Sequence, residues 1–305
     1  MLRYIIKRLL QTILVLFLVV TLVFVLMRCI GDPTKLLVSP EGSYEDIENI
    51  KAALGLDKPV YVQYIDYMRG IVTGDFGSSY YYNRPVTDLI FEHLPATLLL
   101  AGVAVVIAVP LAILFGVIAA VKRNTFLDNI VTTLSIAGRS LPSFWLGLLL
   151  VLLFSVFWKV LPPSGYGQPN QLIMPAITLA AGLCASITRF TRSSMLEVIR
   201  QDYMTTARAK GVYEKKVILH HGLRNALLPV VTMLGLQVGH LLGGSVVVES
   251  IFAWPGIGRM MVSAILTYDY PLVQACSLTM AVVFALVNFV TDMLYTVIDP
   301  RIRYN

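Results

Sequence analysis

The sequence predicts an all-α integral membrane protein with six transmembrane helices. Hydrophobic residues make up 57% of the 305-residue chain and charged residues only 14%, whereas soluble proteins carry roughly 25% charged residues. Apolar runs of about the length that a bilayer requires recur along the chain. Basic residues gather in particular loops, as expected for cytosolic loops. The net charge of +6 does not indicate nucleic acid, because no basic face carries interleaved aromatic residues.

Residues 1–30 are predicted to form a cytosolic tip followed by the first transmembrane helix. Arg3, Lys7 and Arg8 precede an apolar run over residues 9–27. A cleaved signal peptide is the alternative, but its apolar region is usually about 7–15 residues long and ends at a small-x-small cleavage site. The run here is longer and no such site follows it. The positive-inside rule therefore places the N-terminus in the cytosol.

Residues 31–94 form the one long polar segment, and we expect them to be extracytoplasmic. Five lysines and arginines against ten aspartates and glutamates give this segment a net charge of −5. Two helices are expected within it. The first covers residues 46–54, with Ser43 ahead of it and Gly55 at its end, and the second covers residues 60–72.

Residues 95–305 are expected to form the core transmembrane domain. Its five spans are predicted at residues 95–121, 141–157, 172–188, 226–248 and 273–297. Residues 124–140 are predicted to form a short amphipathic helix near the cytosolic face, and residues 260–266 a short helix at the outer face. Six spans place both termini in the cytosol.

The loop at residues 189–225 interrupts the second half of this core with a basic segment. It holds eight basic and three acidic residues, a net charge of +5, which indicates a cytosolic location. Asp202 is a plausible N-cap of a short helix, and Gly211 a left-handed C-cap with Lys210 beside the negative helix end. A second helix is expected to start over residues 214–221 and run into the fifth span. A solvated loop is the alternative interpretation from composition alone.

Small and polar residues mark the fifth span. Gly235, Gly239 and Gly243 repeat every four residues and predict close helix packing, either within this chain or across a subunit interface. Gln237 and His240 lie at membrane depth, where polar side chains are functional candidates. They are candidates for a solute pathway, and a packed, hydrogen-bonded histidine is the alternative. Asp292 is the other intramembrane candidate, and its place about one turn from the cytosolic end allows it to pair with a basic residue there.

Motifs for catalysis or nucleotide binding are absent from the sequence. There is no Gly-x4-Gly-Lys-Ser/Thr phosphate loop, so any driving ATPase must be another chain. His-Glu-x-x-His, Gly-x-Ser-x-Gly and Cys-x-x-Cys are also absent. The cysteines (Cys29, Cys184 and Cys276) lack metal-ligand spacing. We therefore expect no catalytic residues, no metal and no cofactor in this chain.

The basic loop resembles a signature of ATP-driven importers. Ala207-x-x-x-Gly211 resembles the Glu-Ala-Ala-x3-Gly motif of ABC-importer permeases, with Thr205 and Thr206 in the Glu-Ala places. The Ile-x-Leu-Pro part of that motif is degraded here, because Arg224 holds the proline place and a proline follows only at Pro229. The longer pattern Tyr-x-x-Thr-Ala-Arg-Ala-Lys-Gly…His-x-Leu-Arg-Asn-Ala-x-x-Pro is similar to the form found in the oligopeptide/dipeptide/nickel permease family.

Other phrases extend this resemblance over the whole chain. Four further segments are similar to parts of the same family: Leu-Gly-Leu-Asp-Lys-Pro at 54–59, Gly-Asp-Phe-Gly-x-Ser at 74–79, Leu-Pro-Ser-Phe-Trp-Leu-Gly at 141–147 and Asp-Tyr-Pro-x-x-Gln at 269–274. The resemblance implies a multi-pass permease subunit in a bacterial inner (plasma) membrane. It also implies a second homologous permease, two ABC ATPases that bind the ATP, and an extracytoplasmic solute-binding protein.

The family resemblance also implies which residues contact the ATPase. They are Tyr203, Thr206, Ala207, Arg208, Ala209, Lys210, Gly211 and Val212. Peptides are the implied solutes, with glutathione or nickel chelates as alternatives that the sequence does not separate. A stand-alone channel or secondary transporter remains a competing class, and it requires ion-binding carboxylates in the spans, for which Asp292 is almost the sole candidate. A membrane-embedded enzyme is a third class.

Overall fold

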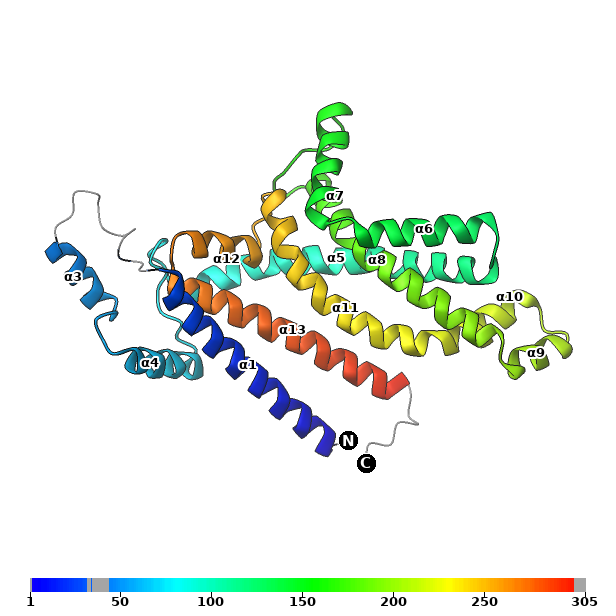
Figure 1. Ribbon diagram of the computed structural model, residues 1–305, viewed down its shortest axis with the longest axis horizontal. Helices are drawn as coiled ribbons and strands as arrows, with labels where there is room; N and C mark the ends of the chain where they lie inside the picture. The colour runs from blue at the N-terminus through cyan, green and yellow to red at the C-terminus, as the bar shows by residue number, and fades with distance from the viewer. Residues whose placement is uncertain (1, 32–33, 35–43, 299–305) are drawn as a thin grey trace. The chain divides into compact units, whose positions relative to one another are not determined.

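The computed structural model describes residues 2–31, 34 and 44–298, and it is helical almost throughout (Figure 1). The helices are α1 (Leu2–Ile30), α3 (Tyr44–Ala53), α4 (Val60–Thr73), α5 (Val86–Val121), α6 (Phe126–Ser140), α7 (Ser143–Leu150), α8 (Pro169–Ile199), α9 (Asp202–Ala209), α10 (Glu214–Lys216), α11 (Arg224–Ile251), α12 (Ile257–Leu266) and α13 (Tyr270–Ile298). Two π-helical segments, η1 (Val151–Phe157) and η2 (Val217–Leu223), extend α7 and precede α11. Within the described ranges, strand pairing is limited to an isolated bridge between Ser78 and Pro85. The predicted all-α class is confirmed.

Five helical stretches are long and apolar enough to cross a membrane. They are Arg8–Cys29, Val86–Val121, Pro169–Ile199, Glu214–Ile251 and Tyr270–Thr291. A sixth candidate is the pair Phe126–Ser140 and Ser143–Phe157, which is bent by 104° at its break. With this pair taken as one span, the helices match the predicted six-span membrane protein.

The predicted third span is wrong in extent. Residues 141–157 hold only α7 and η1, whose 15 residues at 1.5 Å per residue reach about 22 Å, short of the ~30 Å hydrocarbon core. The helix before them, α6, is part of the candidate span and packs along α8, where a Cβ on Gly138 would lie 3.3 Å from the Ala185 Cβ. Pro142 falls at the break, because proline disfavours a helical residue before it and ends the run.

The second span also starts earlier than the sequence predicts. Helix α5 begins at Val86, nine residues before Pro95, and contains both Pro95 and Pro110. Helix α8 continues to Ile199, beyond the predicted end of the fourth span at residue 188, and α1 begins at Leu2, ahead of the predicted residue 9. An apolar run marks the part of a helix that meets lipid and not where the helix ends. The other predicted helices begin and end within a few residues of their expected bounds. Ser43, which is predicted to precede the first helix of the polar segment, and the C-terminal residues 299–305, which are predicted to be cytosolic, lie outside the described residues.

The chain divides into two compact units. Unit 1 comprises Met1–Thr97 and Pro255–Val283, and unit 2 comprises Leu98–Trp254 and Phe284–Asn305. The core of unit 1 joins α1, α5, α12 and α13 through fully buried side chains such as Met27, Val86, Ile257 and Leu272. In unit 2, α8 packs against α6, α7 and α11.

A buried carboxylate ties distant segments of unit 1 together. Asp269 is fully buried, and it accepts a hydrogen bond from the Ser79 hydroxyl. It also accepts the backbone N–H groups of Tyr81 at 3.2 Å and Leu272 at 3.3 Å. A carboxylate with several donors is well satisfied despite burial. Two phrases that resemble the permease family, at 74–79 and 269–274, therefore meet at this residue.

We predict that Asp269→Asn destabilises unit 1 by about 1–3 kcal/mol, because an amide nitrogen would face groups that need an acceptor. Thermal unfolding of the purified protein in detergent measures the effect. Asp66→Asn is the matched control, since the Asp66 carboxylate is 52% exposed in its pair with Lys58 and such pairs contribute little. Equal melting temperatures for the two variants would contradict the role of Asp269.

Candidate functional site

The predicted contact residues lie on α9 and the turn that follows it. Helix α9 links α8 to the long helix Glu214–Ile251, which passes from α10 through η2 into α11. Figure 1 shows α9 and α10 at the same end of unit 2 as the loop between α5 and α6. The second short helix expected from Glu214 is thus the first part of the fifth span, with π-helical winding over Val217–Leu223.

The turn after α9 is a Schellman motif. Gly211 has φ +73°, its N–H donates to the Arg208 carbonyl at 2.9 Å, and the Val212 N–H donates to the Ala207 carbonyl at 3.3 Å. These two bonds satisfy carbonyls that would otherwise be free at the helix end. The left-handed Gly211 agrees with the sequence expectation. The N-cap is Gln201, and Asp202 is the first helical residue, so the predicted Asp202 cap is wrong.

An ion pair closes this turn. The Arg208 guanidinium donates from Nε to Glu214 Oε2 at 3.1 Å and from Nη2 to Oε1 at 3.0 Å. The hydrogen bond to Glu214 raises the pKa of Arg208, so the guanidinium stays charged. Both side chains are more than a third exposed, and such a pair contributes at most about 1 kcal/mol. Its main effect is on geometry, because the two-pronged contact fixes the start of α10 beside α9.

A buried methionine holds α9 against the rest of unit 2. Met204 is fully buried, and it is the one buried side chain of α9. Its methyl group lies over Gly222 in η2, where a Cβ would be 3.2 Å from Met204 Cε and 3.4 Å from Met195 Cε. Met195 in turn packs with Ala120 and Ala226. Met204 was not among the residues predicted from the sequence, although it is the one large aliphatic side chain of the helix.

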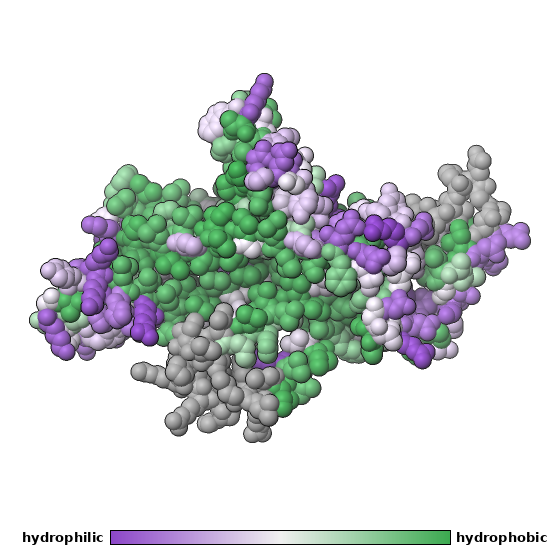
Figure 2. Space-filling model, turned by 180° about the vertical axis from the view of Figure 1, so that it is seen from behind, coloured by the Kyte–Doolittle hydropathy of each residue, from purple (hydrophilic) through white to green (hydrophobic). Residues whose placement is uncertain are grey.

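Apart from Met204, α9 and the turn after it are largely exposed. Six of the eight predicted contact residues are exposed, namely Tyr203, Thr206, Arg208, Ala209, Lys210 and Gly211. The other two, Ala207 and Val212, are half-buried. In Figure 2 the surface over α9 and α10, at the left edge of that view, is hydrophilic, in contrast to the apolar surface of the neighbouring helices of unit 2. The structure thus presents the predicted contact residues on one small polar surface.

We predict that Met204→Ala loosens α9 while leaving the long helices intact, because truncating a buried methionine costs about 2–5 kcal/mol. Hydrogen exchange over residues 202–209 should speed up at least tenfold. Tyr203→Ala is the matched control, since the neighbouring side chain is 42% exposed. Equal exchange in both variants would show that Met204 does not anchor the helix.

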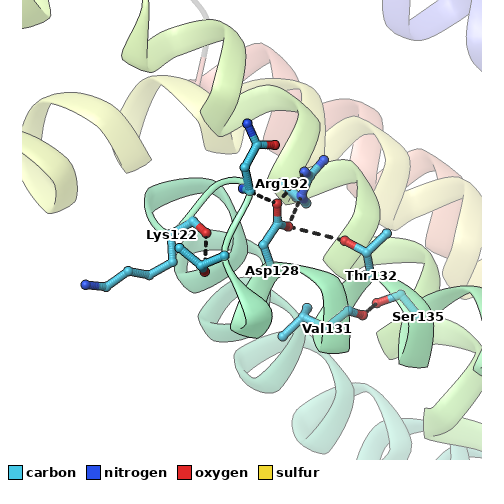
Figure 3. A network of polar contacts seen from close by, with 8 residues as sticks. Lys122, Asp128, Val131, Thr132, Ser135 and Arg192 are labelled. Atoms are coloured by element: carbon cyan, nitrogen blue, oxygen red, sulfur yellow. Dashed lines mark hydrogen bonds and ion pairs between the residues drawn. The ribbon is translucent and has the colours of Figure 1, made fainter.

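A second polar contact fixes the loop between α5 and α6 to α8 (Figure 3). Asp128 is buried, and Arg192 of α8 donates to its carboxylate from Nε at 2.6 Å and from Nη2 at 2.9 Å. The Asn124 N–H adds a bond of 2.9 Å and the Thr132 hydroxyl one of 3.3 Å. Sequence reasoning missed this pair, because its partners are 64 residues apart.

We predict that Asp128→Asn destabilises unit 2 by about 2 kcal/mol or more, because it leaves the Arg192 charge without its partner in a partly buried site. Glu214→Gln, which breaks the exposed pair with Arg208, should change stability by less than about 1 kcal/mol. Chemical denaturation in detergent measures both variants. A smaller effect for Asp128→Asn than for Glu214→Gln would contradict this assignment.

The two pathway candidates share one cavity of unit 2. Gln237 and His240 line a space of about 180 Å³ with Ser143, Thr178, Gly182 and Gly244, at the point where α6 breaks into α7. Among the described residues, neither side chain has a hydrogen-bond partner. The hydrogen-bonded histidine considered from the sequence is thus not observed. The side chain of Asp292 lies outside the described part of the chain.

The three glycines of α11 differ in their surroundings. A Cβ on Gly235 would overlap the Thr291 side chain, and one on Gly239 would overlap the Phe284 ring, so both glycines lie against α13 of the same chain. Gly243 has no such neighbour within 4 Å. The first two positions therefore allow a close contact within the chain.

Comparison with known proteins agrees with the membrane-spanning helical fold described above. The family model "Binding-protein-dependent transport system inner membrane component" matches residues 112–304, and the corresponding N-terminal model matches residues 1–101. This chain is 47% identical over 305 residues to glutathione transport system permease proteins GsiC, with 100% of each chain covered. These relatives come from Escherichia coli, Shigella dysenteriae and Shigella flexneri.

Solved structures with the same fold include the inward-facing MetNI methionine ABC transporter. One crystal form aligns with a TM-score of 0.56 and 19% identity, covering 70% of this chain and 96% of that one. A second form gives a TM-score of 0.56 and 18% identity, covering 69% and 96%.

The fold and the family models define a multi-pass inner-membrane permease subunit of an ABC importer. The chain belongs to the binding-protein-dependent transport system inner membrane component family. This confirms the predicted membership of the peptide-type ABC importers, which work with an ATPase and a solute-binding protein.

Proposed function

We propose that this chain, together with a second homologous permease, forms the translocation path for peptide-type solutes, with glutathione as the first candidate. The solute follows from the GsiC relatives, which are named for glutathione transport and match the whole chain. Other di- and oligopeptides and nickel chelates are the alternatives. The observation that carries the mechanism is the exposed face of α9 above the buried Met204.

In this proposal the polar surface of α9 seats in a cleft of an ABC ATPase. Two ATPases serve the pair of permeases and bind the ATP, so this chain needs no cofactor and catalyses no reaction. Closure of the ATPases on ATP would displace α9, and Met204 would pass the displacement to η2 and α8. Hydrolysis would return the path to its inward-facing state.

The same proposal sets the topology. Both termini and the loop at residues 189–225 lie in the cytosol, residues 31–94 form the extracytoplasmic segment, and residues 95–305 the core permease domain. The basic charge of the loop and the acidic charge of the segment support this orientation. Gln237 and His240 would contact the solute in passage, because their side chains face a cavity and lack partners within the described chain.

We predict that Gly211→Pro and Ala207→Arg each abolish uptake while membrane insertion remains normal. Proline would remove the N–H bonded to the Arg208 carbonyl and cannot adopt φ +73°. Arginine would add bulk and charge to the docking surface. The measurement is ATP-dependent glutathione uptake into proteoliposomes that hold both permeases, the ATPases and the binding protein.

The matched control is Ala52→Arg, on an exposed position of α3, which should leave uptake within about twofold of the wild type because it lies far from α9 in the sequence and outside unit 2. Uptake at the wild-type rate by both Gly211→Pro and Ala207→Arg would contradict the proposal. Transport by this chain without any ATPase would instead support a channel or secondary transporter.

A further inference from the structure

Unit 1 holds a cavity that the transport mechanism above does not use. Its volume is about 520 Å³, within the range of roughly 300–1,000 Å³ that is typical of small-molecule sites. Its walls are formed by five segments: the end of α1, the segment around Leu56, helix α4, the segment around Phe76 and the start of α13. All of these segments belong to the same compact unit.

An arginine without an acidic partner lines this cavity. Arg28 is half-buried; its Nη1 donates to the Phe24 carbonyl at 3.1 Å and its Nη2 to Gln63 Oε1 at 2.6 Å. The Nε group is buried and has no partner. Among the described residues, no carboxylate lies within ion-pair distance of this guanidinium. A partly desolvated charge without a counter-charge is costly, which indicates that an anion completes the site.

The other polar groups of the cavity suit the same ligand. Burial raises the pKa of Tyr80 to about 12 and also raises the pKa of Tyr67, so both phenols stay protonated and can donate. The Tyr67 hydroxyl is buried without a partner. Gln63 and Gln274 add amide groups, and Phe24, Phe76 and Tyr270 supply apolar walls.

The remaining charges around the cavity leave it net positive. Lys58 is paired with Asp66 at 3.1 Å, and Asp75 accepts the Gly77 N–H at 2.9 Å. Arg69 also lines the cavity, and its guanidinium has no hydrogen-bond or ion-pair partner among the described residues. Two guanidinium groups, Arg28 and Arg69, thus outnumber the one unpaired carboxylate of Asp75.

We propose that this cavity is a binding site for the carboxylate of a small peptide-type solute, with Arg28 as the ion-pairing residue. The guanidinium fork matches a carboxylate, and the phenol and amide groups match the peptide bonds beside it. The identity of the solute rests on the proposed function. The site would hold the solute in unit 1, apart from the cavity that contains Gln237 and His240.

The test localises binding at the cavity wall. Thr73 lines the cavity and is exposed, so a Thr73→Cys variant of the assembled transporter in nanodiscs can be labelled with a maleimide and followed by mass spectrometry of the modified peptide. The probe is S-methylglutathione, which has both carboxylates but no free thiol. Its diethyl ester, with both carboxylates blocked, is the matched ligand control.

We expect S-methylglutathione to slow labelling of Thr73→Cys at least fivefold and the diester to have no effect. In the double variant that also carries Arg28→Gln, the concentration of S-methylglutathione needed for the same protection should rise at least tenfold, because a charge-assisted contact is lost. Arg84→Gln is the protein control, since Arg84 lies in the same unit in an exposed pair with Glu92. Equal protection by acid and ester, or equal protection in the Arg28→Gln and Arg84→Gln variants, would overturn the proposal.

A lipid phosphate is the other oxyanion that a guanidinium could bind. Labelling in nanodiscs of phosphatidylcholine alone and with added phosphatidylglycerol separates the two sources. Protection by anionic lipid without protection by the probe would overturn the proposal in favour of a lipid site. If ATP-driven uptake is normal and the probe gives no protection, this inference fails alone; if uptake itself is absent, the proposed function fails.

Discussion

The packing of Met204 over Gly222 is the contact on which the coupling function depends. It is the single buried attachment of α9, and the helix is otherwise held by its turn and by the exposed Arg208–Glu214 pair. Without a packed anchor, a force applied to the polar surface would rotate an eight-residue helix instead of moving the helices behind it. With the anchor, a displacement of α9 reaches η2 and the end of α8, because protein interiors are close-packed and stiff.

The Asp128–Arg192 pair extends this rigid region. Arg192 lies ten residues before Asp202 on the helix that leads into α9. Asp128 of α6 accepts two hydrogen bonds from Arg192 and one from the Asn124 N–H, so it holds the loop between α5 and α6 to α8. The end of unit 2 that carries α9 is therefore braced by two independent interactions, one apolar and one ionic. A coupling surface requires this stiffness. Within a membrane it has to come from side-chain packing and polar contacts between helices, because lipid is as apolar as the helix surfaces and does not drive them together.

Local features of the fold could be predicted from the sequence, and long-range ones could not. Gly211 marks the left-handed turn because glycine tolerates positive φ, and apolar runs mark the spans because the bilayer requires them. The third span was predicted too short, since a broken helix leaves two short runs, of which the first resembles a surface helix and the second a complete span. The partners of Asp269, Asp128 and Met204 were missed, because pairs separated by 190, 64 and 18 residues leave no periodic signal.

The central claim is that this chain acts only as part of an assembly driven by separate ATPases. Affinity purification of the tagged chain in mild detergent, with the co-purifying chains identified and counted by mass spectrometry, tests it most directly. The account predicts one second permease and two ABC ATPase subunits for each tagged chain. A lone protein or a homo-oligomer that persists under gentle extraction would contradict it.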